Sequence, residues 1–445
     1  MKKIICLFLS FVVLMSGVMS MNVFAQSAEE LKFTDIAENV KILSRAAVTE
    51  NGIEADFAGG GIAFSLNCEG DVSLGLEWTG QVGLLSVVIN DDFENASSIK
   101  VTAEGEQSVI IAENLEKGEY TFEVSKANAQ YSNQVVFKSL SFSGSLLEKP
   151  AQRNLKLEFY GDSISCGVGS LSESIADSGN PVGYEDSYLY SYNSYCARYL
   201  GAELSTCALP GYGYLCGYDT GRGQNVYPYM DRALFNKEVA FDHSQYMADI
   251  VVIELGTNDM NYVRQHKEIV EDSEIDKMVQ DYIDKIRSYN ENCFIILLGT
   301  VSSGTLTVNN KANNHYIKTD NALLRAAATN EKTFYIPKLG MGISGRGYHP
   351  KASEAAVGGK TLADFITENI LSGKELPPVV APEDFYLNFD INDDDKFNLV
   401  DVLLIRSYLS KSSTRYTESD IDVTGDGKAD MKDSFKAIKK LAELE

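Results

Sequence analysis

The sequence is poor in positive charge. Lysine and arginine together number 39 against 63 aspartates and glutamates, which gives a net charge of −24. Nucleic acids and anionic membrane surfaces are bound mainly through basic patches, so the charge balance excludes both as expected partners. Neutral soluble partners, or calcium ions, suit such an acidic chain better.

Long apolar runs are absent after the first 25 residues. The chain begins MKK, continues with IICLFLSFVVLMSGVMSM, and reaches a junction that ends in Ala25. A basic start, an apolar segment and a small-residue junction predict a secretory signal peptide over residues 1–25, cleaved after Ala25. A membrane anchor is the alternative reading, but no second apolar segment follows. We therefore expect a secreted, extracellular protein.

Several chemical signatures are also missing. The chain has no CxxC pair, so zinc binding of that type is not expected. The six cysteines after the leader show no dense spacing, which leaves both free buried thiols and disulfides open. The G-x-S-x-G elbow is absent. GGKT at 358–361 is not a phosphate loop, because Glu354 stands where the first glycine is required.

Four zones follow the leader, so the chain is expected to be multidomain. Residues 27–148 contain short β-branched and aromatic runs between turn residues, which predicts an antiparallel β-sandwich. Residues 153–372 alternate apolar strands such as IVVIELG with helical segments such as EIDKMVQDYIDKIRSY, which predicts an α/β domain with a parallel sheet covered on both faces. A Pro-rich linker is expected at 373–383 and a small acidic module at 384–445.

The acidic module repeats one pattern, DINDDDKFNLVD at 390–401 and DVTGDGKADMKD at 422–433. Oxygen-bearing side chains stand at positions 1, 3, 5, 9 and 12 of each loop, and position 7 offers its carbonyl, which is the spacing that surrounds a calcium ion. The sequence therefore predicts two structural calcium ions. The expected ligands are Asp390, Asn392, Asp394, Lys396, Asn398 and Asp401 in the first loop, and Asp422, Thr424, Asp426, Lys428, Asp430 and Asp433 in the second.

A single helical segment follows each loop, and position 12 is Asp in both. This duplicated arrangement resembles the type I dockerin modules that attach secreted plant-wall enzymes to cellulosomal scaffolds. The resemblance implies a small α-helical domain whose partner is a cohesin domain of a scaffoldin. It also implies that the partner is contacted by Leu399, Val400, Met431 and Lys432. Asp395 departs from the glycine usual at position 6, and Thr424 is neutral.

Four candidate catalytic residues lie in the α/β zone. Ser163 lies in GDSISCG after the strand-like LKLEFY, Gly211 lies in ALPGYGY, Asn258 lies in ELGTNDM, and His349 lies in SGRGYHP. Each has an ordinary structural explanation when taken alone. Open α/β proteins bind ligands at the carboxyl edge of the sheet. A serine, a base and oxyanion donors gathered there would make an acyl-transfer site.

These blocks, in this order, resemble the SGNH (GDSL-type) hydrolases, whose catalytic domain is flavodoxin-like. With a β-sandwich in front and EDSYLYSYNSYCARYLGAEL between blocks, the chain is most similar to the second family of carbohydrate esterases, secreted deacetylases built from a jelly roll and an SGNH domain. The resemblance covers roughly residues 30–370. It implies Ser163 as nucleophile, His349 as base, and the Ser163 N–H, Gly211 and Asn258 as oxyanion donors, with no catalytic cofactor.

The position three residues before the histidine departs from the family pattern. The acid usual there is replaced by Arg346, which has only hydrogen-bond donors and a positive charge. We expect a Ser163–His349 dyad whose histidine is oriented by a backbone carbonyl, with Arg346 pointing to solvent. The competing hypothesis is that a distant carboxylate, either Asp259 or Glu354, replaces the acid.

The position of tryptophan is a second departure from the family pattern. The family often presents a tryptophan in its cleft, whereas the only tryptophan here is Trp78, in the predicted sandwich. We expect a tyrosine, such as Tyr212 or Tyr262, to take its place.

The leading functional hypothesis is an O-acetyl esterase that removes acetyl groups from plant cell-wall polysaccharides such as xylan or glucomannan. An SGNH lipase or thioesterase is one alternative, and a catalytically inactive carbohydrate-binding protein is another. The intact Ser163, Asn258 and His349 argue against inactivity. A lipase should show a broad apolar groove or a lid, which the sequence does not display.

Overall fold

The computed structural model describes residues 29–81, 83–176, 183–218, 221–266, 270–299 and 311–373, and in the tail residues 389, 391–392, 397–412, 415–416, 418–424 and 428–444. The predicted signal peptide lies outside the described residues, as does the whole linker except Gly373. Within these ranges, none of the helices has both the length and the apolar character needed to cross a membrane.

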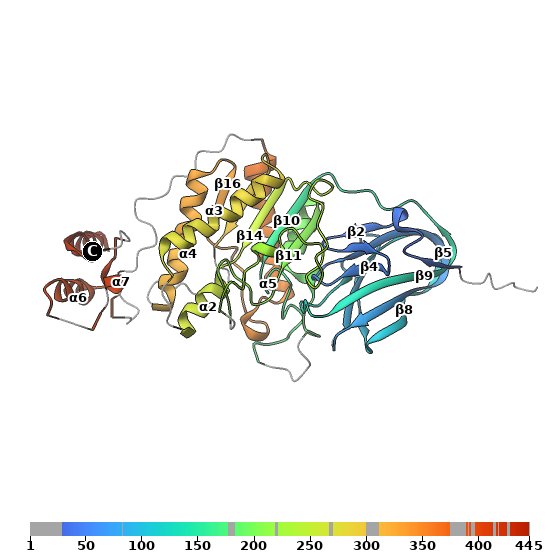
Figure 1. Ribbon diagram of the computed structural model, residues 1–445, viewed down its shortest axis with the longest axis horizontal. Helices are drawn as coiled ribbons and strands as arrows, with labels where there is room; N and C mark the ends of the chain where they lie inside the picture. The colour runs from blue at the N-terminus through green and yellow to red at the C-terminus, as the bar shows by residue number, and fades with distance from the viewer. Residues whose placement is uncertain are drawn as a thin grey trace, which may run out of the picture.

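The first part of the chain forms a network of nine antiparallel strands (Figure 1). The long strand β5 (Gly61–Thr79) pairs with both β8 (Gly105–Lys126) and β9 (Gln134–Leu146). Alternate residues of β5 are buried, and Trp78 lies within the apolar interior. The predicted antiparallel β domain is therefore confirmed. Its other strands are β1 (Glu29–Lys32), β2 (Lys41–Leu43), β3 (Ala47–Thr49), β4 (Gly52–Ala55), β6 (Gly83–Ile89) and β7 (Ser97–Val101).

A five-stranded parallel sheet forms the centre of the second part of the chain. Its strands are β10 (Lys156–Gly161), β11 (Glu203–Ala208), β14 (Ile250–Glu254), β15 (Phe294–Leu298) and β16 (Thr333–Ile336), in the order β11-β10-β14-β15-β16. Every residue of β14 is buried, as expected for a strand covered on both faces. The strand order reverses at β10, and open α/β sheets bind ligands at such a switch point.

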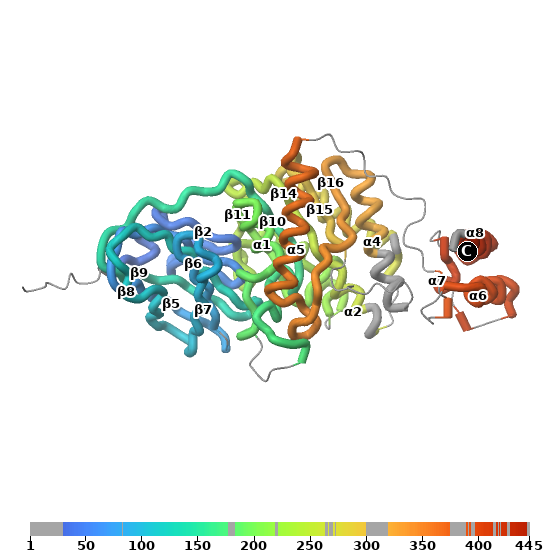
Figure 2. The backbone as a smooth tube through the Cα atoms, turned by 180° about the vertical axis from the view of Figure 1, so that it is seen from behind, coloured from blue at the N-terminus to red at the C-terminus, as the bar shows by residue number. Residues whose placement is uncertain are grey.

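Helices cover both faces of this sheet. On one face, α3 (Asp272–Tyr289) and α4 (Lys311–Thr329) pack against β14 and β15 (Figure 1). On the other face, α1 (Tyr192–Leu200) and α5 (Ala352–Ile366) pack side by side (Figure 2). The predicted doubly covered α/β domain is therefore confirmed. The helix α2 (Thr257–His266) follows β14, and a small hairpin pairs β12 (Cys216–Gly217) with β13 (Gly221–Arg222).

One arginine of the β domain is buried inside the α/β domain. Arg45, between β2 and β3, places its Nη2 at 2.5 Å from Oε1 of Glu158 on β10. Its Nη1 donates to the carbonyls of Met230 and Arg232 at 2.8 Å each, and its guanidinium lies over the Phe241 ring. Burial opposes the charge of Arg45, but Glu158 more than offsets this and the pKa of the arginine rises. The two domains are therefore joined by a buried ion pair.

The tail contains α6 (Leu399–Leu409), α7 (Glu418–Ile421) and α8 (Met431–Leu444). Buried residues of α6 and α8 pack together with Ile421 in a small apolar core of their own. The predicted small α-helical domain is confirmed in this form.

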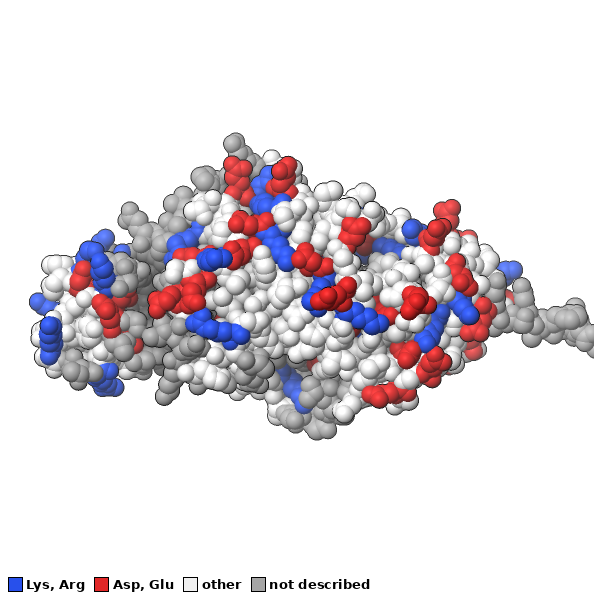
Figure 3. Space-filling model, viewed as in Figure 1, with Lys and Arg blue, Asp and Glu red and all other residues white. Residues whose placement is uncertain are grey.

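The distribution of charged side chains and the state of the cysteines are both consistent with the sequence. On the face drawn in Figure 3, acidic and basic side chains are interspersed, and acidic ones gather over the β domain. The six cysteines from Cys68 to Cys293 are buried and free, so the thiol alternative is the correct one.

Candidate active site

The parallel sheet brings three of the predicted site residues to one edge. Ser163 follows β10, Gly211 follows β11, and Asn258 lies in the first turn of α2, just after β14. Because β10 pairs in parallel with both β11 and β14, the carboxyl ends of the three strands meet. His349 reaches this edge from the loop before α5, so the fold gathers the whole predicted set.

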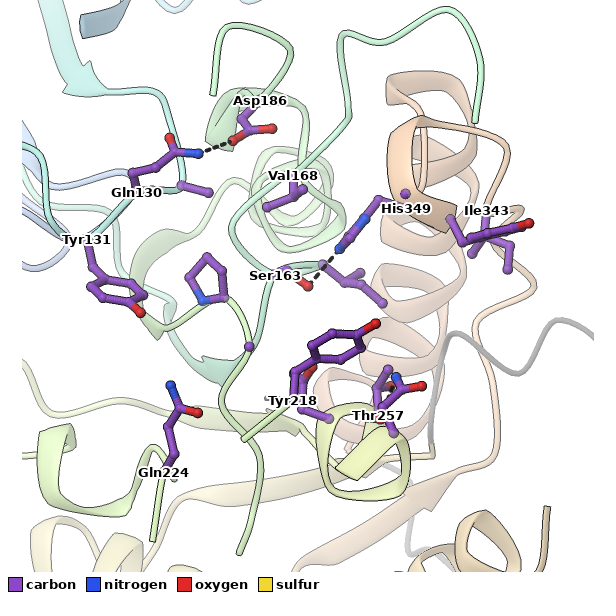
Figure 4. Close-up of a pocket in the computed structure, with 18 of the residues that line it drawn as sticks. Gln130, Tyr131, Ser163, Val168, Asp186, Tyr218, Gln224, Thr257, Ile343 and His349 are labelled. Carbon is purple, nitrogen blue, oxygen red and sulfur yellow. Dashed lines mark hydrogen bonds between the residues drawn. The ribbon is translucent and has the colours of Figure 1, made fainter. Parts of the chain in front are cut away.

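A hydrogen bond joins the candidate nucleophile to the candidate base. The Nε2 atom of His349 lies 2.7 Å from Oγ of Ser163 (Figure 4). On the other side of the ring, Nδ1 lies 3.0 Å from the main-chain carbonyl of Arg346. The expected backbone carbonyl is therefore present, and it accepts a hydrogen bond from the Nδ1–H of the neutral imidazole. This fixes the tautomer in which Nε2 can take a proton from the serine.

The loop that holds His349 is tightly turned. Gly347 and Tyr348 both adopt left-handed backbone conformations, with φ of 63° and 61°. The amide of Gly345 donates to the carbonyl of His349 at 2.8 Å and closes the loop. A tyrosine with positive φ is uncommon, and here the turn brings the carbonyl of Arg346 back to the imidazole three residues on.

The prediction for the Arg346 side chain is wrong. Its Nη1 lies 3.3 Å from Oε2 of Glu185, and the arginine side chain is only 17% exposed. The guanidinium does not point to solvent, because a carboxylate on the neighbouring segment pairs with it. Neither of the two carboxylates suggested as a replacement acid, Asp259 and Glu354, has a contact with His349 among the described residues. Asp259 accepts the backbone N–H groups of residues 214–216, and Glu354 caps α5 and accepts from Ser344.

A different carboxylate acts on the base, and the sequence reasoning missed it. Asp186 is buried in the cleft wall, where it accepts from the amide of Gly169 at 3.0 Å and from Gln130 at 3.3 Å. Burial lowers the pKa of His349 below its usual value, while the Arg346 carbonyl and the charge of Asp186 partly oppose this. The base is therefore neutral near pH 7 and ready to accept a proton. Asp186 does not stand in a recognisable catalytic motif. The only signal in the sequence was the acidic pair Glu185–Asp186 at the start of EDSYLYSYN.

Of the three predicted oxyanion donors, two backbone N–H groups are available, and the third, the Asn258 side chain, already has partners. Within the described part of the chain, the amide N–H groups of Ser163 and Gly211 meet no protein acceptor. Gly211 has φ of 84°, a conformation suited to glycine. The amide nitrogen of Asn258 instead donates to Oδ2 of Asp162 at 3.1 Å and to the carbonyl of Tyr212 at 2.8 Å. An oxyanion would have to share one of these protons, so the role of Asn258 stays a prediction.

A cleft of about 1000 Å³ opens beside Ser163 and His349 (Figure 4). Part of its wall comes from the segment between β8 and β9, so both domains build it. Tyr212 is only 8% exposed and packs against Tyr131. Neither Tyr212 nor Tyr262 lines the cleft, so both named candidates are wrong, but three other tyrosines do line it. The aromatic and polar side chains that do line it include Tyr131, Tyr218, Tyr348, Gln130, Gln224 and Asn261.

The two loops of the tail share one pattern of contacts. Asp401 and Asp433, at position 12 of each loop, are fully buried. Each uses one oxygen to accept an N–H near the start of its loop, at Ile391 or Thr424, and the other to accept the N–H at position 9, at 2.9 or 2.7 Å. Each carboxylate therefore joins the start of its loop to the end of the loop by hydrogen bonds. Asp390, Asp394, Lys396 and Asp426 lie outside the described residues, as do Asp395 and Gly427.

The predicted partner-binding residues are exposed on the first turns of α6 and α8. Leu399, Val400 and Met431 are 59%, 48% and 50% exposed, and Lys432 is exposed as well. The sequence reasoning missed further apolar side chains on the next turns of these helices. They are Leu403, Phe435 and Ile438, which are at least 40% exposed.

Two segments match known families. Residues 159–355 match the GDSL-like Lipase/Acylhydrolase family, and residues 388–442 match the dockerin type I domain. The chain carries a GDSL-like acylhydrolase domain and a type I dockerin. The first match contains all four predicted catalytic residues, and the second contains both loops.

Comparisons with individual proteins agree with this assignment. Over 158 residues, which are 35% of this chain, the sequence is 34% identical to Cellulase/esterase CelE of Acetivibrio thermocellus, and the match spans only 19% of that protein. The fold is similar to that of a family two carbohydrate esterase from Cellvibrio japonicus, with a TM-score of 0.65, 16% identity, and 77% of this chain and 98% of that one covered. An acetyl xylan esterase, Est2A, from Butyrivibrio proteoclasticus gives a TM-score of 0.66 at 19% identity and covers 78% and 100%.

Proposed function

We propose that the protein is a secreted carbohydrate O-acetyl esterase that a dockerin attaches to a cellulosomal scaffold. The observation that carries the proposal is the 2.7 Å hydrogen bond between Ser163 Oγ and His349 Nε2, at the carboxyl edge of a GDSL-like domain. The esterase relatives support ester hydrolysis. The dockerin and the similarity to a cellulase/esterase, CelE, support plant-wall polysaccharide, such as acetylated xylan or glucomannan, as the substrate.

The geometry supports a serine mechanism in two halves. Ser163 attacks the acetyl carbonyl while His349 takes the serine proton at Nε2, and the Arg346 carbonyl holds the ring. The N–H groups of Ser163 and Gly211 would donate to the oxyanion, and the Asn258 side-chain amide would do so by sharing a proton that it now gives to Asp162 or Tyr212. His349 then gives the proton to the sugar hydroxyl that leaves. Water, activated by the same histidine, frees acetate from the serine and returns the site to its starting state.

Polar and aromatic side chains in the wall of the cleft support a glycan as the bound group. Gln130, Gln224 and Asn261 offer amide donors and acceptors, and Tyr218 and Tyr348 are 41% and 61% exposed. Sugar hydroxyls require hydrogen-bonding partners of this kind. The dockerin, which is typical of plant-wall enzymes, makes a lipase or thioesterase the weaker candidate.

The domain arrangement belongs to the same proposal. We assign a signal peptide to residues 1–25, a jelly-roll β-sandwich to 27–148, the esterase domain to 153–372, a linker to 373–383 and the dockerin to 384–445. The nine antiparallel strands suit a jelly roll, and the register shifts of β5 between Cys68 and Ser73 are irregularities of the kind that bend a strand around such a domain.

Calcium fits the residues of the tail. Carboxylate and amide oxygens are the ligands that calcium prefers, and the described members of each loop are of this kind or supply a carbonyl. Asn392, Asn398 and Asp401 would hold one ion together with the undescribed members of the first loop. Asp422, Thr424, Lys428, Asp430 and Asp433 would hold the other. The bound ion offsets the negative charge that each loop collects, and the exposed residues of α6 and α8 would then meet a cohesin.

Replacing the nucleophile tests the proposal. Ser163→Ala is expected to lower turnover of a small acetyl ester by several orders of magnitude while the fold is kept, because Ser163 contributes to the reaction and little to packing. Ser132→Ala, which removes a hydroxyl from the wall of the same cleft, is the matched control and should stay near the parent rate. If Ser163→Ala retained activity within about tenfold of the parent, Ser163 would not be the nucleophile.

A further inference from the structure

Two carboxyl groups lie directly behind the candidate nucleophile. Glu254 is the last residue of β14 and pairs in register with Gly161 at the end of β10. The residue after Gly161 is Asp162, so the turn that carries Ser163 starts beside Glu254. Both carboxyl side chains are completely buried.

The contacts of the two groups are unequal. Asp162 accepts the amide of Ile164 at 2.9 Å and the side-chain amide of Asn258 at 3.1 Å. Oε2 of Glu254 accepts the hydroxyl of Ser165 at 3.2 Å, and the backbone N–H of Asp162 also acts on the Glu254 carboxyl group. Its other oxygen, Oε1, is buried and meets no donor among the described residues. The two carboxyl groups are themselves within hydrogen-bonding reach of each other.

The surroundings do not allow both groups to be charged. Burial raises the pKa of Asp162 to about 7 and raises that of Glu254 well above its usual value, and the charge of Asp162 raises the latter further. The other titratable groups that face Glu254 are Tyr192 on α1 and Tyr214, and Asp259 acts on both Asp162 and Tyr214. None of these neighbours is a cation. A pair of buried carboxyl groups in such surroundings shares one proton.

The proton belongs on the group that has a buried oxygen without a donor, which is Glu254. Two N–H groups stabilise a carboxylate at Asp162, whereas the unpaired Oε1 of Glu254 can be satisfied if it carries a hydrogen and donates it. We propose that Glu254 is a neutral carboxylic acid that donates a hydrogen bond to the Asp162 carboxylate and so acts as a positioning residue for the active site. Its catalytic consequence rests on the proposed function, while its protonation does not.

The arrangement connects both halves of the site. Asp162 holds the Ser163 turn through Ile164 and holds the Asn258 amide through Nδ2. Removing the donor behind Asp162 would let its carboxylate turn, which would shift the serine and the oxyanion donor together. Misplacement of reacting groups by about 1 Å can cost about a hundredfold in rate.

Infrared spectroscopy tests the protonation directly. At pH 7 the parent protein should show the carbonyl stretch of a protonated carboxylic acid, and Glu254→Gln should remove a component of that band. Glu203→Gln is the matched control, since Glu203 is also shielded, on strand β11, but forms an ion pair with Lys41 at 2.5 Å, and this variant should leave the band unchanged. A parent without the band, or a Glu254→Gln protein with an unchanged band, would overturn the proposal.

Kinetics test the positioning. Glu254→Gln keeps a neutral donor facing Asp162 and should hold kcat near the parent value. Glu254→Leu keeps the volume but not the donor, and should lower kcat by about a hundredfold with KM little changed. Equal losses in the two variants would contradict a role for the donated hydrogen bond. If Glu254→Leu did not fold, the infrared comparison would still decide, and it would also do so if the parent hydrolysed no acetyl ester.

Discussion

At the scale of single residues, the resting charge of His349 sets how the site responds to pH. A base must be neutral to act, and burial lowers the pKa of His349 below its ordinary value of 6.5. The rate therefore falls only when pH drops through this lowered pKa. Removing the charge of Asp186, which raises that pKa, should lower it further. We predict that Asp186→Asn moves the acidic limb of the pH dependence of kcat/KM to lower pH.

The same charge also stabilises the imidazolium formed during attack, so the plateau rate of Asp186→Asn should fall. The control is Glu185→Gln, which removes the neighbouring carboxylate that pairs with Arg346. It should leave the acidic limb close to that of the parent. An acidic limb that stays in place, or moves to higher pH, in Asp186→Asn would contradict the electrostatic role of Asp186.

The sequence predicted which serine and histidine come together better than it predicted the groups around them. Ser163 stands in a short motif after a strand and His349 in a short motif before a helix, and a carbonyl was the acceptor left once Arg346 replaced an acid. The Arg346–Glu185 pair, the Asp186 charge and the contact between Asp162 and Glu254 join segments that only the tertiary fold brings together. A motif carries no information about such contacts, because it does not state which segments will be neighbours.

At the scale of elements, the tail can fold only if its two loops close, and each loop brings several negatively charged side chains together when it does. The buried carboxylates of Asp401 and Asp433 tie each loop to the start of its helix, and the core between α6 and α8 is small. Small domains of this kind rely on their ions for folding. We predict that chelation of calcium unfolds the dockerin and abolishes cohesin binding, while ester hydrolysis continues.

Both activities are measured in one sample, by cohesin pull-down and by acetate release, before and after chelation. Restoring calcium should restore the binding. Loss of ester hydrolysis together with cohesin binding would contradict the separation of the two functions, and binding that survives chelation would contradict the role of the ions.

Elements with strong periodicity were predictable, and elements shaped by their neighbours were not. The run IVVI of β14 was predictable because a strand covered on both faces needs apolar residues at nearly every position, although the buried Glu254 at its end was not expected from this pattern. The bend of β5 and its pairing with two long strands could not be read from alternation, because alternation fixes which side chains point inward but not which strands become partners.

At the scale of the whole molecule, Arg45 makes the β domain and the α/β domain depend on each other. Removing one partner of a buried ion pair leaves an uncompensated charge. We predict that Arg45→Met lowers the free energy of unfolding by about 3–5 kcal/mol. Lys138→Met is the control, since Lys138 pairs with exposed Glu106, and it should cost less than about 1 kcal/mol.

Denaturant unfolding of both variants measures the difference. The double variant Arg45→Met with Glu158→Met should recover much of the lost stability, because no charge is then stranded. A single Arg45→Met variant as stable as Lys138→Met would show that the buried pair does not join the domains.

The central claim is that this molecule removes acetyl groups from plant-wall polysaccharides at Ser163. The measurement that tests it most directly is acetate release from a panel of acetylated polysaccharides that includes xylan and glucomannan, with the parent and Ser163→Ala proteins side by side. We expect the parent to release acetate from at least one of these glycans and Ser163→Ala to release none. Acetate release by Ser163→Ala at the parent rate, or a parent that leaves every acetylated glycan intact while cleaving long-chain lipid esters, would contradict it.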